Sequence, residues 1–107
     1  MTDFSDAAHR SRVLSAADEL AAMLDTLPAI EGSDWAASHR RYREAVTVLS
    51  RELTTRQDNP ARISEGYSDV YISLLGFRAS GASGFAAACR NWIAQVRKKA
   101  DAWKAHQ

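Results

Sequence analysis

The residues best suited to acid–base or nucleophilic chemistry are His39 and the single cysteine, Cys89. A cysteine thiolate activated by a nearby histidine can act as a nucleophile. Such a site also needs a group that orients the histidine and donors that stabilise an oxyanion, and no such pattern accompanies these residues. An enzyme would require a pocket formed by His39, Cys89 and Tyr67. We instead expect His39 at the edge of the core and Cys89 inside it as a small apolar residue, and we predict no catalytic residues.

Metal chemistry in a helical protein would need Glu-x-x-His pairs or closely spaced cysteines and histidines. No glutamate stands three residues before any of the three histidines. Asp6 and His9 have this spacing, but no second pair accompanies them. We therefore predict neither a metal ion nor any other cofactor.

The segment 78–84, Arg-Ala-Ser-Gly-Ala-Ser-Gly, is a secondary candidate for anion binding. Backbone N–H groups at the start of a following helix, together with Arg78, Ser80 and Ser83, could hold a phosphate or carboxylate. The segment lacks the glycine and lysine spacing of a phosphate-binding loop. Serine and glycine are also typical of a flexible turn between helices, which is the simpler expectation.

Positive charge is concentrated in two places. The net charge is +1, but the first 31 residues hold six acidic and two basic residues, whereas residues 80–107 hold five basic residues and one acidic residue. We expect the acidic first helix and the basic last helix to pair in part. The candidate partner-binding cations are Arg40, Arg41, Arg43 and Arg51 in one cluster, and Arg97 and Lys98 in the other. Guanidinium groups suit contacts with carboxylates, and the same cations could instead neutralise the phosphates of a nucleic acid.

Four amphipathic segments must position these residues, because apolar side chains recur at alternating spacings of four and three. The stripes are Val13, Ala17, Leu20, Leu24, Leu27; Trp35, His39, Tyr42, Val46, Leu49, Leu53; Ile63, Tyr67, Val70, Leu74, Phe77; and Phe85, Cys89, Trp92, Val96, Ala100, Trp103. Breaks at Pro28, around 57–60 and at 80–84 separate the segments. The pattern predicts an all-α protein, an antiparallel up-down-up-down four-helix bundle, with residues 1–107 as a single domain. Its third helix would span 60–78, and the aromatic residues of the stripes would lie in the core.

Val48 and Ile72 point away from the stripes of their own segments. On a bundle surface they would mark a contact site for another chain. Together with the missing catalytic patterns, this predicts a non-catalytic protein-interaction module, an adaptor, regulator or inhibitor that docks on a larger protein. Nucleic-acid binding through the basic helix faces is the alternative, and self-association as a homodimer is also open.

The chain has no apolar run near the roughly 18 residues of a membrane span, and its start does not resemble a signal peptide. A single cysteine also excludes a disulfide within the chain and suits a reducing compartment. We therefore expect a cytoplasmic protein without a membrane partner.

Overall fold

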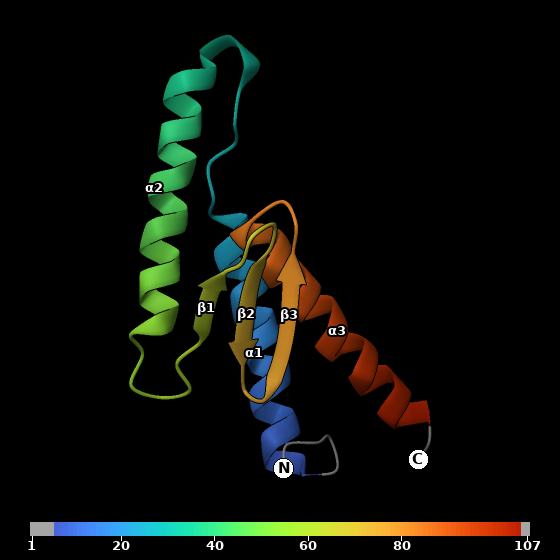
Figure 1. Ribbon diagram of the computed structural model, residues 1–107. Coiled ribbons are helices and arrows are strands. Elements are labelled where there is room, and N and C mark those ends of the chain that lie inside the picture. Colours follow the sequence, from blue (N-terminus) through green and yellow to red (C-terminus); the bar gives the residue numbers. More distant parts are fainter. Residues whose placement is uncertain (1–5, 106–107) are drawn as a thin grey trace.

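The computed structural model describes residues 6–105, which form three α-helices, a short 3₁₀ helix and a three-stranded antiparallel sheet (Figure 1). In chain order the elements are α1 (Ala7–Asp25), η1 (Gly32–Asp34), α2 (Trp35–Thr54), β1 (Arg62–Glu65), β2 (Val70–Leu74), β3 (Phe77–Gly81) and α3 (Phe85–Ala105). None of the helices in this described part combines the length and apolar character of a membrane span.

The predicted all-α four-helix bundle is wrong, because residues 62–81 form the sheet and not a third long helix. The strands pair in the order β1-β2-β3, with Ile63 opposite Ile72 and Ile72 opposite Ala79. β-branched and aromatic residues favour strands. The turn between β2 and β3 holds Leu75 and Gly76, both at positive φ, which is the backbone of a tight hairpin turn and ends any helix there.

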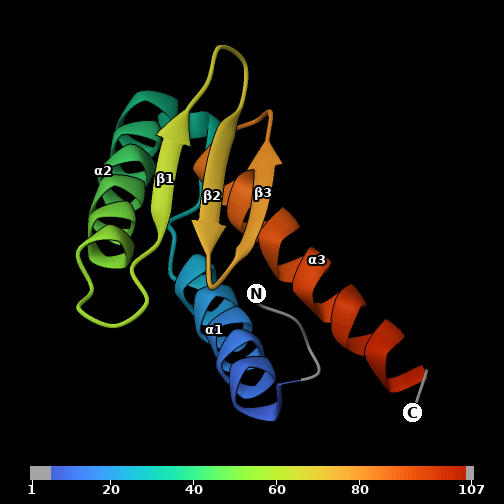
Figure 2. The same ribbon diagram turned by 60° about the horizontal axis from the view of Figure 1, so that its bottom comes forward.

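The core lies between one face of the sheet and the helices α1 and α3 (Figure 2). The α1 stripe of Val13, Ala17, Leu20 and Leu24 is buried, as is the α3 stripe of Phe85, Cys89, Trp92, Val96 and Ala100. Asp6 begins α1, and its carboxylate accepts hydrogen bonds from the N–H groups of Ala8 and His9 at 3.0 and 3.2 Å. Two of the predicted stripes therefore do form the core, on a sheet and not on two further helices.

The helix α2 is fixed to the rest of the fold mainly through its C-terminal end. Leu49 and Leu53 are buried there, and the N–H of Ala61 donates to the carbonyl of Leu53 at 3.0 Å. Just past the helix, Arg56 forms an ion pair with Glu19 of α1. The N-terminal part of α2 extends beyond the sheet and stands apart from α1 and α3 (Figure 1).

Candidate protein-interaction site

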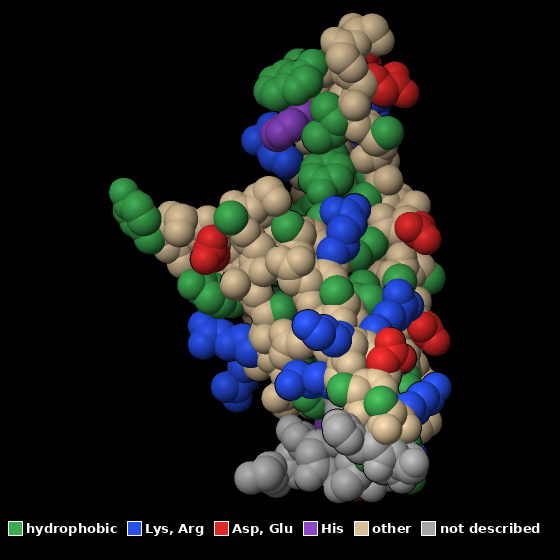
Figure 3. All heavy atoms as spheres, turned by 90° about the vertical axis from the view of Figure 1, so that its right-hand side faces the viewer, with side chains coloured by type: hydrophobic (Ala, Val, Ile, Leu, Met, Phe, Trp, Pro, Cys, Tyr) green, Lys and Arg blue, Asp and Glu red, His purple; other side chains and the backbone are tan. Residues whose placement is uncertain are grey.

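The apolar stripe of α2 continues past the point where the core ends. Trp35, His39, Tyr42 and Val46 occupy its N-terminal half, and we call them the arm stripe. Trp35 is 60% exposed, and the other three side chains are half-buried. The indole of Trp35 stacks on the His39 imidazole, with ring centroids 4.8 Å apart. Figure 3 shows hydrophobic side chains next to a histidine at this projecting end. The core prediction is therefore wrong for Trp35.

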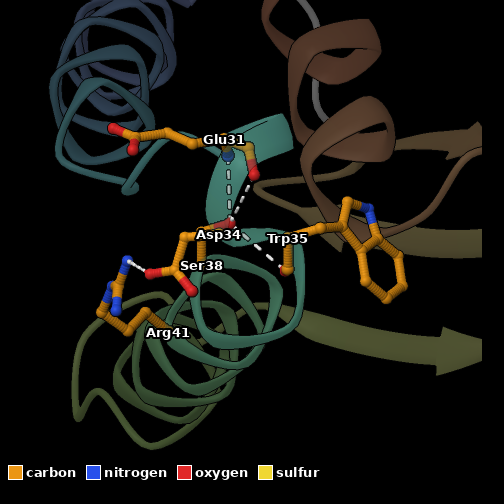
Figure 4. Close-up of polar contacts among 5 residues, drawn as sticks. All are labelled: Glu31, Asp34, Trp35, Ser38 and Arg41. Carbon is orange, nitrogen blue, oxygen red and sulfur yellow. Dashed lines mark hydrogen bonds and ion pairs between the residues drawn. The ribbon is translucent and has the colours of Figure 1, made fainter.

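The start of α2 is held in place by local hydrogen bonds (Figure 4). The buried Ser38 hydroxyl accepts from the N–H of Glu31 at 3.0 Å and lies 3.2 Å from the carbonyl of Trp35. Asp34 ends the 3₁₀ helix and forms an exposed ion pair with Arg41 at 3.6 Å. The Trp35 side chain points away from this cluster (Figure 4). The arm stripe thus lies on a helix whose first turn is fixed by its own linker.

A groove separates α2 from the underside of β1 and the start of α3. Its volume is about 510 Å³. The apolar residues that line it are Val46, Ile63, Val70 and Phe85, and Arg51 and Glu65 are its charged ones. Next to it lies a hollow that reaches Tyr42 and Ser83 and shares Val46 and Phe85 with the groove. Val46, the last residue of the arm stripe, therefore also lines this groove, together with the apolar residues Ile63, Val70 and Phe85.

The structure distributes the predicted partner-binding residues over three places. Arg40, Arg43 and Val48 line one shallow hollow on the outside of α2, and Val48 is 63% exposed there. Arg51 lines the groove. Lys98 is exposed on α3.

Two of the predicted cations already have acidic partners. Arg97 of α3 pairs with Asp18 of α1 at 3.0 Å, which confirms the expected pairing of the acidic first and basic last helices. Arg41 pairs with Asp34. Because these four side chains are largely exposed, each pair contributes a few tenths of a kcal/mol, roughly. The two basic clusters lie on separate helices, and one cation of each is already paired, which makes them a weaker phosphate-binding surface than the sequence alone indicated.

Ile72 was predicted as a surface contact, and this is wrong because its side chain is fully buried. It lies in the middle strand between Ile63 and Ala79, on the face that α1 and α3 cover. If residues 60–78 formed a helix, Ile72 would lie opposite the apolar stripe of that helix. Residues 70–74 instead form a strand, so the helical period does not apply to them. In a strand, alternate residues share a face, so Ile72 lies on the same face as Val70 and Leu74.

The predicted anion-binding loop is also different from expectation. Arg78 and Ser80 belong to β3, and Ser83 is exposed in the turn before α3. The residue that directly precedes α3 is Gly84, at a φ of +121°. Arg78 stacks on Tyr71 of the neighbouring strand. The three side chains therefore do not converge on the start of α3.

His39, Cys89 and Tyr67 do not form a pocket. Cys89 is fully buried in α3, His39 lies against Trp35 on the arm, and Tyr67 is fully exposed in the β1–β2 turn. Among residues 6–105 there is also no group of histidine, cysteine and acidic side chains that could hold a metal ion. His39 and Cys89 therefore do not combine into a nucleophile–base pair in residues 6–105.

Burial raises the pKa of the Cys89 thiol to about 12, although the nearby Arg90 charge lowers it slightly. At pH near 8 its thiolate fraction is then about a thousandfold smaller than that of an ordinary cysteine. We expect a thiol reagent such as Ellman's to label native Cys89 far more slowly than the urea-unfolded chain. Equal rates would show that the thiol is exposed.

The same pKa shift makes stability depend on pH. The folded thiol keeps its proton to higher pH than the unfolded one, so its contribution is complete below the ordinary pKa of 9.0 and is lost as the pH rises towards about 12. We expect Cys89→Ala to remove this part of the alkaline loss of stability in urea unfolding.

Comparison with protein families, with curated proteins and with solved structures gives no match for this chain.

Proposed function

We propose that this chain is a non-catalytic protein-interaction module, an adaptor, regulator or inhibitor that docks on a larger protein through α2. The observation that carries the proposal is the arm stripe, an amphipathic helix face that continues beyond the core and has no cover along Trp35. Large exposed aromatic side chains such as Trp35 are residues on which binding energy concentrates in protein interfaces.

The area that the fold leaves exposed supports this proposal. A compact folded monomer of 11.8 kDa exposes about 5,900 Å², whereas this chain exposes 6995 Å². Its radius of gyration is 15.1 Å, compared with about 13 Å for a compact domain of this length. The chain thus exposes about 1,100 Å² more than a compact monomer of this mass. The N-terminal part of α2 projects beyond the sheet (Figure 1).

Charge indicates which partner the arm would accept. Residues 35–46 hold three arginines and one glutamate, and Arg40 and Arg43 have no ion pair within the described part of the chain. Two α2 arms packed together would bring these like charges close, which opposes a symmetric dimer. Arg40 and Arg43 line the hollow beside Val48, to one side of the arm stripe. An amphipathic helix seated on the stripe would therefore reach them only through acidic side chains along one of its flanks. We therefore propose an acidic helix of another protein as the occupant.

A cytoplasmic location and the absence of catalysis belong to the same proposal. A reducing compartment suits the free and buried Cys89. His39 lies on α2 and Cys89 on α3. We therefore assign neither of them a catalytic role in this proposal.

Site-specific photocrosslinking tests the proposal directly. p-Benzoylphenylalanine at Trp35 should capture one discrete protein in the source cell, and the same probe at Val48, on the opposite side of α2, should not. Reconstitution of the captured pair must then reproduce binding. A crosslink to a second copy of the chain would replace the partner proposal with self-association, and discrete capture from Val48 alone would overturn the arm stripe as the site.

Trp35→Ala should weaken the reconstituted complex at least about tenfold and leave the fold intact. Because Trp35 is 60% exposed, its loss should change the melting temperature by no more than about 3 °C. Calorimetric titration and thermal unfolding measure the two quantities separately. Val48→Ala is the matched control, and comparable weakening by both variants would contradict a site on the stripe.

A further inference from the structure

The outer face of the sheet is the side away from α1 and α3. Its strand residues are arginines and residues with hydroxyl groups, and none of them is acidic. Strand pairing places Arg62 beside Ser73 and Ser73 beside Arg78 in one row across the sheet. The neighbouring row consists of Ser64, Tyr71 and Ser80. We call these six residues the outer sheet face. Since adjacent strands are about 4.8 Å apart, the two arginine backbones are about 10 Å apart with a serine between them.

The Arg78 guanidinium lies over the Tyr71 ring on this surface. The guanidinium carbon of Arg78 lies 4.5 Å from the centre of the Tyr71 ring, within the range of a cation–π contact. The Tyr71 ring in turn lies over Gly66, where an added Cβ would be only 2.8 Å from the ring edge. A ring seated on a glycine and covered by a guanidinium presents a planar cation to solvent, and such planes stack on nucleobases.

A second aromatic ring stands at one end of the sheet. Tyr67 lies in the turn between β1 and β2 and is fully exposed. It makes no contribution to the core. The nearest acidic residues on β1 and in the turn are Glu65 and Asp69. Glu65 lines the groove on the other side of the sheet, and the carbonyl of Asp69 closes the turn by accepting from the N–H of Gly66 at 2.7 Å.

We propose that the outer sheet face binds single-stranded nucleic acid. Bases would stack on the Arg78 plane and on Tyr67, while Arg62 neutralises a phosphate and the serine hydroxyls bond the backbone. Open β-sheets with exposed rings and cations bind unpaired strands in this way because every base has a face that can stack. The face has no apolar centre of the kind that protein interfaces bury. This surface lies on a different element from the arm stripe, so the proposal is independent of the function proposed above.

Fluorescence anisotropy with labelled oligouridine and oligothymidine of about 12 nucleotides tests the proposal, using the whole chain. We expect binding at about 50 mM salt that weakens as salt is added. Arg62→Ala/Arg78→Ala should weaken it at least about tenfold and make the slope of log affinity against log salt shallower by about 1.4. Tyr67→Ala should weaken it by about tenfold. Circular dichroism checks that each variant is folded.

The control variant is Arg90→Ala/Lys98→Ala, which removes two exposed cations from α3. Equal weakening by both double variants would reveal general attraction to a polyanion and overturn the assignment. Arg78→Lys keeps the charge but removes the plane, so it should keep the salt slope and lose affinity.

Two further probes separate other classes of ligand. A duplex of the same length should bind more weakly than the single strand, because its bases are already stacked. Equal binding of the duplex, or competition by polyglutamate as effective as that of the oligonucleotide, would overturn the proposal in favour of a duplex or an acidic polypeptide. Lack of binding at low salt would overturn it altogether.

Discussion

Replacing Gly81 with alanine should destabilise the fold by about 3 kcal/mol and lower the melting temperature by about 15 °C. Gly81 ends β3 where the backbone of α3 lies directly against the strand. An added Cβ would lie 2.4 Å from the amide nitrogen of Ala88 and 2.6 Å from the carbonyl carbon of Ala87. Both obstructing atoms belong to the helix backbone, so no side-chain rotation can relieve the clash. Either α3 or β3 must shift, and their contact carries much of the core.

Gly32→Ala is the matched control for this result. An added Cβ at Gly32 meets nothing within 4 Å, so its effect should stay within about 0.5 kcal/mol. Urea unfolding followed by circular dichroism measures both variants. Equal stability of Gly81→Ala and the parent chain would mean that α3 lies farther from β3 than the structure shows.

The helices α1 and α3 could be predicted from the sequence because their stripes are long and regular. About four to five turns of four-and-three spacing leave little ambiguity about the period. The same spacing was misleading for residues 62–81. Val70, Leu74 and Phe77 fit a helical stripe, yet Val70, Ile72 and Leu74 also alternate as in a strand. Short segments satisfy both periods at once, and only the turn chemistry decides between them.

The sequence carries only half of the usual turn signal at Leu75 and Gly76, namely the glycine. A hairpin turn of two residues at positive φ strongly prefers asparagine or aspartate before glycine. This chain has a leucine there, at a φ of 53°, and the leucine packs against the core. Apolar contact thus offsets an unfavourable backbone geometry, and the usual hairpin signal is missing.

The candidate docking site was only partly predictable. The stripe of Trp35, Tyr42 and Val46 was visible, but periodicity shows that a helix is amphipathic and does not show what covers its apolar face. How much of the apolar face of α2 is covered depends on the contacts that the linker before α2 and the C-terminal end of α2 make with the rest of the fold. Those contacts, such as the pairing of Arg56 with Glu19, join residues far apart in the chain, and no local pattern reveals them.

The outer sheet face could not be predicted at all while residues 62–81 were assigned to a helix. Arg62 and Arg78 are neighbours of Ser73 only through strand pairing. On a helix, residues 62 and 78 would lie more than four turns apart. The placement of each charge therefore depended on the secondary structure assigned to it.

Trp92→Phe should destabilise the fold by about 2–3 kcal/mol. Trp92 is fully buried in α3, and its indole N–H lies 3.1 Å from the carbonyl of Phe77 and 3.3 Å from that of Leu74. These carbonyls flank the strained hairpin turn, so one donor ties α3 to both strands. Phenylalanine keeps an aromatic ring but removes the donor and leaves a small void, so two buried acceptors lose a partner that water cannot replace.

Trp103→Phe is the control, because Trp103 is half-exposed near the end of α3 with the Arg10 guanidinium 3.8 Å from its ring centre. A phenyl ring preserves most of that contact, and the cost should stay below about 1 kcal/mol. Urea titrations of the two variants should give the parent slope with different midpoints, since the loss lies in the folded state. If both variants lost the same stability, the indole hydrogen bonds would contribute nothing, and the attachment of α3 to the hairpin would rest on ring packing alone.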